Sequence, residues 1–459
     1  MDFNQLHKIY FIGIGGIGMS ALARYFNSIG KSVYGYDRTE TTLTKKLTDE
    51  GIQINYKDNT DSIPQIILKD KESSIIIYTP AIPVENTILN YFKINNFKLY
   101  KRAELLGFIT KNFKTFAIAG THGKTSVSTM ATHILKEGNY ACYGFLGGIS
   151  KNTDSNFILP TSSKAEKIAV VEADEFDRSF LHLHPYIGLI TSIDADHLDI
   201  YEDKNDLVKS FEQFVKNIKQ NGILIYKKDI TLQVSGTLNK FSYSLTDRAD
   251  YHARNLKMNS NGTYCFDLQT PKGIIVNLET GMPGKINVEN AIAAVALAHV
   301  AGISDDIIRI QLQSFRGIKR RFDFQIVTEH FVFIDDYAHH PEELKAFISS
   351  VKEIFKGKKI TGVFQPHLFT RTRDFADEFA HSLDMLDELV LLDIYPAREK
   401  PIKGISSKTI FDKLNLEKKS ICTKDELPGY LKESKPEVLV TMGAGDIDKL
   451  IEPIKNEFI

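Results

Sequence analysis

The chain carries two glycine-rich segments whose residue types suit phosphate binding. The first reads Gly13-Ile14-Gly15-Gly16-Ile17-Gly18 and lies between an apolar run and a helical pattern over Met19–Ser28. Glycines let a backbone approach a diphosphate at a helix N-terminus, where free N–H groups and the helix dipole favour anions. Asp37 ends the next apolar run, at the place of the sugar-binding carboxylate in a dinucleotide-binding fingerprint. The segment predicts a diphosphate ligand, with NAD or a purely structural turn as alternatives.

The second segment is most of a P-loop. It reads Gly120-Thr121-His122-Gly123-Lys124-Thr125, follows the apolar run Thr115–Ala119 and continues through Ser126 into a helical pattern. Such a loop offers a cradle of N–H groups, a lysine for the β- and γ-phosphates and a hydroxyl for Mg²⁺. Ile118 stands where the usual pattern has its first glycine. The remaining residues still predict ATP with Mg²⁺ as ligands.

Acidic residues close two further apolar runs. Glu172, Asp174 and Glu175 follow the run that begins at Ile168, and Asp194-Ala195-Asp196-His197-Leu198-Asp199 follows the run Ile187–Ser192. The carboxyl ends of parallel strands are where ligands of such sheets bind, so a metal ligand beside a P-loop belongs there. Glu172 and His197 are therefore the candidate ligands. The alternatives are carboxylates that stabilise a helix N-terminus and a structural histidine, since Mg²⁺ prefers oxygen.

Two asparagines precede an alanine-rich helical pattern over Ala291–Ala301. Asn287 and Asn290 belong to the segment Gly284-Lys285-Ile286-Asn287-Val288-Glu289-Asn290. Their amides could pair with the edge of an adenine ring. Capping of the following helix is the alternative.

Three later segments bring basic and imidazole side chains to strand ends or to a domain junction. They are Lys319-Arg320-Arg321-Phe322, Asp335-Asp336-Tyr337-Ala338-His339-His340-Pro341, and Gln365-Pro366-His367 with Thr370, Arg371 and Arg373. An arginine at a junction could hold a phosphoryl group during its transfer, and arginine also suits a substrate carboxylate. A solvated basic patch is the alternative for the first of these segments.

These residues need a scaffold of alternating strands and helices, and the sequence indicates one. Expected strands are Ile9–Ile14, Ser32–Tyr36, Ser74–Tyr78, Thr115–Ala119, Ile168–Glu172, Ile187–Ser192, Ile223–Tyr226, Phe331–Ile334, Ile360–Phe364, Glu388–Leu392 and Val438–Thr441. Near-continuous apolar runs are typical of parallel strands that are buried on both faces. The class is therefore α/β, in three blocks over residues 1–110, 111–317 and 318–459. The second block includes a more β-like stretch over 230–280, with turns at Asn261-Gly262 and Pro271-Lys272-Gly273.

Net charge, cysteine spacing and the apolar stretches argue against several classes of protein. The formal net charge of the 459 residues is −1, which gives no electrostatic reason to expect nucleic acid or an anionic membrane as partner. Three cysteines lie far apart without a CxxC pair, so we expect neither a disulfide framework nor a structural zinc site. The apolar stretch Ile9–Ala23 holds four glycines and follows little positive charge, unlike a signal peptide. We expect a cytoplasmic protein with no segment inserted in a membrane.

The ordered set of segments resembles the Mur ligase family. The resemblance covers essentially the whole chain and rests on GIGGIGMSALA, GTHGKTS, EADE, DADHLD, the N-x-x-N helix, KRRFD, DDYAHHP, FQPHLFTRTRDF and DIYPAREKP. It implies a Rossmann-like N-terminal domain for a UDP-sugar, a central P-loop ATPase domain and a Rossmann-like C-terminal domain that helps to bind an amino acid. It also assigns the diphosphate of the first glycine segment to UDP, so that NAD becomes a minor alternative.

The resemblance also implies roles for individual residues. Lys124 would hold the ATP phosphates, Thr125 and Glu172 one Mg²⁺, and Glu172 with His197 a second. Asn287 and Asn290 match positions beside adenine, Arg321 a phosphate contact and Asp336 a ribose contact. His339, His367, Arg371 and Arg373 would lie near the amino acid, with His339 as a candidate base.

The implied reaction is ATP-dependent amide formation through an acyl phosphate, with UDP-N-acetylmuramate and L-alanine as substrates and a monomer or homodimer as the working form. A recycling ligase that takes a tripeptide, a folylpolyglutamate-type ligase, a nucleotide sensor and an NAD-dependent oxidoreductase are the alternatives. Two positions depart from the family pattern. Ile286 stands where relatives commonly have histidine, and Glu212 stands near the place of a carbamylated lysine, whose charge it could replace.

Overall fold

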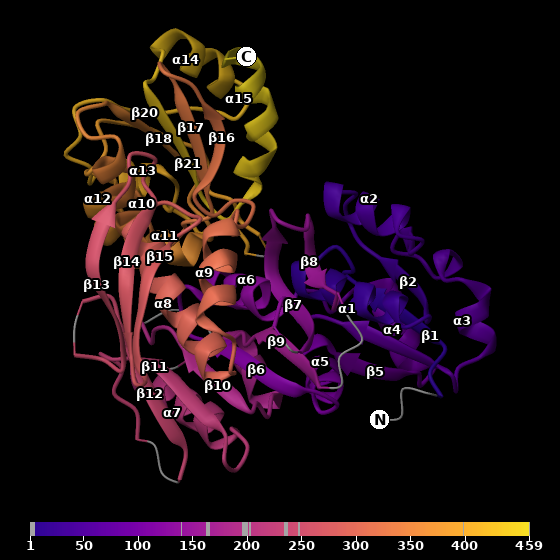
Figure 1. Cartoon of the computed structure of the whole chain (residues 1–459). Helices are drawn as coiled ribbons and strands as arrows, with labels where there is room; N and C mark the ends of the chain where they lie inside the picture. The colour runs from indigo at the N-terminus through magenta and orange to yellow at the C-terminus, as the bar shows by residue number, and fades with distance from the viewer. Residues whose placement is uncertain are drawn as a thin grey trace. The chain divides into compact units, whose positions relative to one another are not determined.

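A computed structural model describes residues 5–138, 140–161, 166–194, 201, 203–233, 237–246, 248–397 and 399–458 (Figure 1). The chain forms three sheets and two compact units. One unit takes the chain up to Arg254 together with residues 268–275 and 291–312. The other takes residues 255–267, 276–290 and 313 onward. Each unit is described below by itself.

The first sheet has five parallel strands in the order β3-β2-β1-β4-β5. Its strands are β1 (Lys8–Ile12), β2 (Ser32–Tyr36), β3 (Gln53–Asn55), β4 (Ser74–Tyr78) and β5 (Lys98–Lys101), with helices α1 (Ile17–Ser28), α2 (Thr42–Asp49), α3 (Gln65–Lys69), α4 (Thr87–Ile94) and α5 (Arg102–Thr110). The expected order of strand, glycine segment and helix is confirmed. Strand β1 is central because Ile9, Phe11 and Ile12 are fully buried.

The second sheet has ten strands in the order β15-β14-β13-β12-β11-β10-β6-β9-β7-β8. Its strands are β6 (Lys114–Ala119), β7 (Ala141–Ser150), β8 (Ser155–Ile158), β9 (Lys167–Glu172), β10 (Ile187–Ile190), β11 (Ile223–Lys227), β12 (Asn239–Ser244), β13 (Tyr251–Met258), β14 (Tyr264–Thr270) and β15 (Gly273–Glu279). The associated helices are α6 (Lys124–Leu135), η2 (Phe176–His182), α7 (Lys204–Lys216), α8 (Lys285–Val300) and α9 (Asp305–Ser314). Strand β6 pairs in parallel with β9 on one side and β10 on the other.

The sequence analysis predicted the β-rich end of this sheet but not strand β7. The β-like stretch over 230–280 forms β12 to β15, and its turns fall at the two expected places. Strand β7 was not expected, because its three glycines resemble a loop more than a strand. The alanine-rich helix was predicted to begin at Ala291, which is wrong: α8 already begins at Lys285. Asn287 and Asn290 therefore lie inside the helix.

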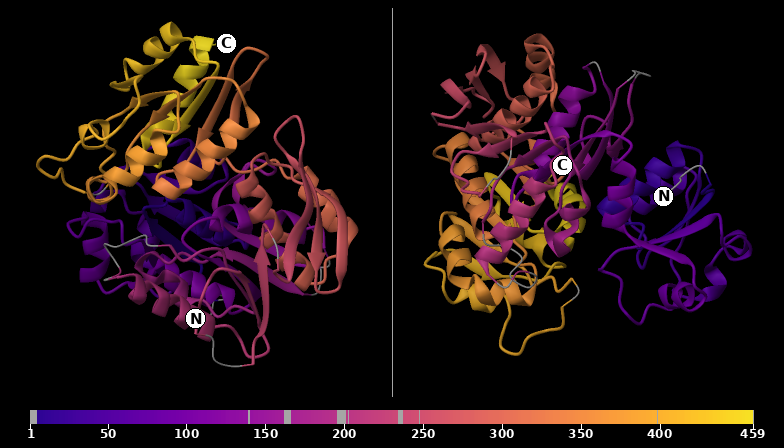
Figure 2. Two further views of the ribbon diagram at one scale, coloured as in Figure 1. Left: turned by 90° about the vertical axis from the view of Figure 1, so that its left-hand side faces the viewer. Right: turned by 90° about the horizontal axis from the view of Figure 1, so that it is seen from below.

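The third sheet has six strands in the order β16-β17-β21-β18-β19-β20 (Figure 2). Its strands are β16 (Asp323–Val327), β17 (Val332–Asp336), β18 (Ile360–Phe364), β19 (Glu388–Leu391), β20 (Lys419–Ile421) and β21 (Val438–Met442). Its helices are α10 (Pro341–Ile354), α11 (Phe369–Asp374), α12 (Ala376–Leu383), α13 (Lys408–Phe411), α14 (Leu427–Ser434), η3 (Asp446–Leu450) and α15 (Ile451–Phe458). Strand β16 is antiparallel to β17, and the other pairings are parallel.

Helix α1 packs against the hairpin of β7 and β8. The ring of Tyr25 lies 5.6 Å from that of Phe145 and 6.0 Å from that of Phe157, between centroids. The fully buried Asn156 donates to the carbonyl of Ile17 at 2.5 Å and accepts a hydrogen bond from Arg24. The hairpin therefore supports the first turns of the helix that follows the first glycine segment. None of the described helices is long and apolar enough to cross a membrane.

We expect Asn156→Ala to lower the free energy of unfolding by about 1–3 kcal/mol, because it removes the hydrogen-bond partner of the buried side chains of Arg24 and Ser20. Chemical denaturation followed by fluorescence measures the loss. The control is Lys46→Ala, which removes the more exposed ion pair between Lys46 and Asp154 and should cost below about 1 kcal/mol. Equal losses in both variants would contradict this account of the hairpin.

Candidate active site

The P-loop joins β6 to α6 in a conformation that requires glycine. Gly123 takes a φ of 80° directly before the helix, and Gly120 takes a φ of 134°. A Cβ atom on Gly120 would lie 2.0 Å from the hydroxyl oxygen of Thr191. Both positions are thus closed to other residues. The absence of glycine at position 118 has a simple reason, because Ile118 is a fully buried strand residue.

The end of β10 fixes the other side of the P-loop. The hydroxyls of Thr121 and Ser192 lie 2.8 Å apart, and the Ser192 hydroxyl accepts the His122 amide at 2.9 Å. The amide of Asp194 donates to the Thr121 hydroxyl at 3.0 Å. The sequence singled out the segment after this strand, but not Ser192 itself. Its remaining candidate, His197, lies outside the described residues.

Lys124 forms an ion pair with a buried carboxylate. Its ammonium nitrogen lies 2.7 Å and 2.9 Å from the two oxygens of Glu175, which is fully buried. It also donates to the carbonyl of Gly120 at 2.5 Å. Burial lowers the pKa of Lys124, but Glu175 and two further carboxylates outweigh it and raise the pKa above its usual value. Glu175 was only a minor candidate in the sequence analysis, and in the structure it is the partner of the P-loop lysine.

Glu172 is the last residue of β9, which pairs with β6 on the side away from β10. Its carboxylate accepts the amide of Gly147 at 3.1 Å. A Cβ atom on Gly147 would lie 2.1 Å from the same carboxylate, so β7 approaches Glu172 through a glycine. Thr125 places a buried hydroxyl in the first turn of α6. Hydroxyl and carboxylate oxygens are the donors that Mg²⁺ prefers, so the chemistry of both residues fits the expected ion.

Within the described residues, no group of three His, Cys, Asp or Glu side chains is placed to hold a metal. A complete metal site would need a ligand of another type, such as the Thr125 hydroxyl, or a residue outside the described part of the chain, such as His197. The structure therefore places Thr125 in the first turn of α6 and Glu172 at the end of β9, the strand next to the P-loop strand β6. The third expected ligand, His197, lies outside the described residues.

The first glycine segment is organised by Asp37. One carboxylate oxygen accepts the amide of Gly15 at 2.8 Å, and the other accepts the amide of Thr39 at 3.2 Å. Gly13 takes a φ of 85° at the end of β1. The side chain of Met19 is buried and lies close to Gly16, 3.6 Å from where a Cβ atom of that residue would be. Asp37 thus shapes the loop, and a sugar hydroxyl would have to share its oxygens.

The two asparagines lie in the first turns of α8 and are buried. The Asn287 amide donates to the carbonyl of Pro283 at 2.7 Å, and the Asn290 amide lies 3.5 Å from the Asn287 side-chain oxygen. The alternative of a helix cap is wrong, because both residues lie within the helix. The neighbouring Ile286 is 39% exposed, so it offers an apolar surface where relatives were expected to have a polar group.

Asp336 holds the turn that contains the basic segment. Its carboxylate accepts the amides of Phe322 at 2.7 Å and Ala338 at 2.8 Å. Phe322 and Arg320 both take positive φ angles, of 46° and 64°. Burial raises the pKa of Asp336 to about 6, against the opposing effect of Arg321. The carboxylate therefore stabilises a strained turn that presents Arg321.

Imidazole, guanidinium and phenol groups gather after β17 and β18. The guanidinium of Arg321 lies 5.1 Å from the Tyr337 ring and 3.8 Å from a Glu343 oxygen. The same Glu343 carboxylate lies 3.1 Å from the ring nitrogen Nδ1 of His339. The rings of His339 and His367 are 6.0 Å apart between centroids. Glu343 is thus a shared partner that the sequence did not indicate.

The two arginines of α11 differ. Arg371 is buried, whereas Arg373 is half-exposed and pairs with its neighbour Asp374 at 2.6 Å. The helix itself is held by Glu399, whose carboxylate accepts the amides of Phe369 at 2.6 Å and Thr370 at 3.1 Å. The sequence grouped both arginines with His367, and the surface position of Arg373 separates it from them.

Family models cover nearly all of the chain in the expected order. Residues 8–114 match the Mur ligase family catalytic domain, 118–298 the Mur ligase middle domain and 320–445 the Mur ligase glutamate ligase domain. The chain belongs to the Mur ligase family. The three-domain α/β architecture and the P-loop that were inferred from the sequence are those of a Mur ligase.

Individual relatives extend the similarity over whole chains. A UDP-N-acetylmuramate–L-alanine ligase of Parabacteroides distasonis is 48% identical over 99% of this chain and 98% of its own. The solved UDP-N-acetylmuramate–alanine ligase of Thermotoga maritima is 27% identical, covers 98% of this chain and 99% of its own, and has a TM-score of 0.82. A murein peptide ligase of Psychrobacter arcticus shares the fold with a TM-score of 0.72 at 19% identity, over 98% of this chain and of its own.

Glu212 of this Mur ligase lies in α7, at the place discussed for a carbamylated lysine. Its carboxylate accepts the amide of Gln233 at 3.0 Å. This contact gives the side chain a local role in fixing a loop. The suggestion that Glu212 replaces the charge of a carbamate stays a prediction.

We expect Glu175→Gln to bind ATP more tightly than the wild type does. The phosphates of ATP compete with Glu175 for the ammonium group of Lys124, and a neutral amide competes less. Differential scanning fluorimetry should show a larger upward shift of Tm by ATP in the variant. Glu166→Gln, which alters an exposed pair with Lys114, is the control with an unchanged shift. A smaller shift in Glu175→Gln would contradict the competition.

We expect Asp336 to make folding less favourable as pH rises. Its pKa is about 6 in the folded chain and about 4 when unfolded, so the folded state holds the proton more tightly. The stability from this group is complete below about pH 4 and lost towards pH 6, by about 3 kcal/mol. Denaturation of the wild type and of Asp336→Asn should therefore differ in slope over this window. Parallel pH profiles would contradict the raised pKa.

Proposed function

We propose that this Mur ligase joins L-alanine to the carboxylate of UDP-N-acetylmuramate at the expense of ATP, in the synthesis of peptidoglycan precursors. The observation that carries the proposal is the 48% identity to the ligase of Parabacteroides distasonis over both whole chains. The geometry of Lys124, Thr125 and Glu172 supports it, because these groups suit phosphoryl transfer from ATP.

The chemistry requires activation of the carboxylate. A carboxylate anion repels nucleophiles and has no leaving group, so it does not form an amide with an amine in neutral water. Transfer of the γ-phosphoryl group converts it into an acyl phosphate. The amine of alanine then attacks the carbonyl carbon, and the tetrahedral intermediate expels phosphate.

The residues of the first unit divide this work. The P-loop from Gly120 to Ser126 and the ammonium group of Lys124 hold the ATP phosphates, with the amides of Thr121 and His122 already bonded to Ser192. Thr125 and Glu172 would hold one Mg²⁺, and Glu172 with His197 would hold a second. The chemistry that such ions would supply is neutralisation of the charge on the phosphates. The segment from Gly13 to Met19, shaped by Asp37, holds the diphosphate of the UDP-sugar.

The residues of the second unit bind the other partners. Asn287 and Asn290 lie beside adenine, Asp336 beside its ribose and Arg321 beside a phosphate. Asp336 keeps lone pairs free for a hydroxyl, since its two hydrogen bonds use two of about four acceptor positions. His339 accepts the proton of the amine, with its Nδ1 atom held by the Tyr337 carbonyl at 2.9 Å and lying 3.1 Å from Glu343. His367 and Arg371 face the amino acid, and Arg373 is the weaker candidate because Asp374 already pairs with it.

The remaining expectations belong to the same proposal. The ligase works in the cytoplasm as a monomer or homodimer and binds neither nucleic acid nor membrane. A tripeptide in place of alanine would make it a recycling ligase. The Psychrobacter arcticus neighbour shows only that such enzymes share this fold.

The test is release of phosphate from Mg·ATP in the presence of UDP-N-acetylmuramate. L-alanine and the stem tripeptide are compared as acceptors, and the product is weighed by mass spectrometry. We expect release with alanine and a product heavier by one alanyl residue. Lys124→Met should lower kcat by at least about 100-fold, since it removes a charge that stabilises the transition state.

Each other outcome has a definite meaning. If phosphate is released only with the tripeptide, the tripeptide is the acceptor substrate and alanine is not. Release with neither acceptor, while ATP still binds, would contradict a ligase and indicate a nucleotide sensor.

A further inference from the structure

Arg102 lies directly against the last glycine of the first glycine segment. It is the first residue of α5, and its side chain packs on Gly18 in the first turn of α1. A Cβ atom on Gly18 would lie 2.9 Å from the guanidinium nitrogen Nη1 and 3.1 Å from Cδ. A side chain at position 18 would therefore have to displace the end of the arginine side chain.

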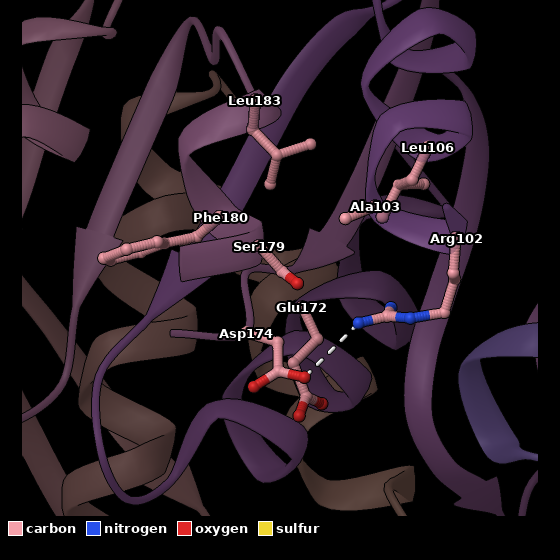
Figure 3. A pocket seen from close by; sticks show the side chains of 8 residues that line it. All are labelled: Arg102, Ala103, Leu106, Glu172, Asp174, Ser179, Phe180 and Leu183. Carbon is pink, nitrogen blue, oxygen red and sulfur yellow. Dashed lines mark hydrogen bonds and ion pairs between the residues drawn. The ribbon is translucent and has the colours of Figure 1, made fainter. Parts of the chain in front are cut away.

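The opposite edge of the guanidinium group is held by Asp174. Nη2 of Arg102 donates to Asp174 at 3.3 Å, and the other oxygen of Asp174 accepts the amide of Phe176 at 3.1 Å (Figure 3). In the described part of the chain, this is the single hydrogen bond of the Arg102 side chain. Nη1 keeps its donors towards Gly18. The arginine is 20% exposed, so solvent or a ligand can reach it.

Arg102 connects two parts of the proposed site. Gly18 belongs to the segment assigned to the UDP diphosphate, and Asp174 lies two residues after the candidate metal ligand Glu172. Figure 3 shows Arg102, Asp174 and Glu172 around one small hollow, which Ser179 also lines. A nucleotide sugar that spans from the glycine segment to Glu172 must pass this guanidinium group. Arginine is well suited to bind phosphate oxygens with two parallel hydrogen bonds.

We propose that Arg102 binds the diphosphate of the nucleotide sugar, and that Asp174 is the positioning residue that holds the guanidinium group towards Gly18. This inference rests on the proposed function, since it names a further residue of the same site. The planar group contributes Nη1 and Nε to the ligand, while Nη2 stays with Asp174. The α1 amides and Arg102 would then hold the diphosphate from two sides.

The test compares Arg102→Met with a matched neighbour. Lys101→Met is the control. Lys101 directly precedes Arg102, and it also pairs with an aspartate after β9, namely Asp177 at 3.2 Å. Affinity for UDP-N-acetylmuramate is measured by calorimetry without alanine, and ATP affinity is measured separately. We expect Arg102→Met to weaken the sugar nucleotide by about 10- to 100-fold, with ATP binding unchanged. Lys101→Met should stay within about twofold of the wild type.

Further variants separate positioning from binding. Arg102→Lys should recover part of the affinity, since it keeps the charge but not the planar donors. Asp174→Asn should weaken the sugar nucleotide less than Arg102→Met does. Gly18→Ala should weaken it in the wild type, and should cost less in the Arg102→Met background, because the added methyl group then displaces no arginine.

A second ligand identifies the group that Arg102 contacts. UDP-N-acetylglucosamine has the same diphosphate but lacks the lactyl carboxylate, so both ligands should weaken alike. A loss confined to UDP-N-acetylmuramate would overturn the diphosphate contact in favour of the carboxylate. Equal losses of affinity in Arg102→Met and Lys101→Met, or no loss in either, would overturn the role of Arg102 and leave the proposed function standing. A wild type that does not bind UDP-N-acetylmuramate would overturn the proposed function as well.

Discussion

The charge of Lys124 is the constraint on which the P-loop side of the structure depends. Its side chain is 12% exposed, and an ion in such a place needs a partner of opposite charge. Glu175 supplies that partner without nucleotide, and the carbonyl of Gly120 adds a hydrogen bond. Glu175 must in turn be fully buried at the end of β9, which fixes the path of the chain after Glu172. A phosphate chain can replace the carboxylate because it brings the same charge.

Sheet order explains how distant segments meet around this lysine. Strand β6 lies between β9 and β10, so the carboxyl ends that carry Glu172 and Ser192 flank the P-loop. Strand β7 is next to β9 and approaches Glu172 through Gly147. The same strand continues into the hairpin that supports α1. One run of parallel pairing therefore relates the phosphate-binding loop to the helix of the first glycine segment.

Much of this could be predicted from sequence, because apolar runs and glycine segments are local signals. The strands before Asp37, Glu172 and Asp336 were expected within a few residues. The partners were not, since a contact such as Lys124 with Glu175 joins residues far apart in the chain. The sequence did not indicate Arg102, because an arginine at the start of a helix is usually a surface residue. Its contact with Gly18 is visible only in the structure. Strand β7 was missed because its glycines serve close approach and not a turn.

The cap of α11 has a consequence for how substrate preference could change in evolution. Glu399 holds the first turn of this helix from a loop thirty residues further along the chain. A mutation in that loop would shift the helix and the buried Arg371 with it, while every residue in contact with the amino acid stayed the same. Selection could then adjust the choice between alanine, glycine and serine in small steps, and a comparison of pocket residues alone would overlook the change.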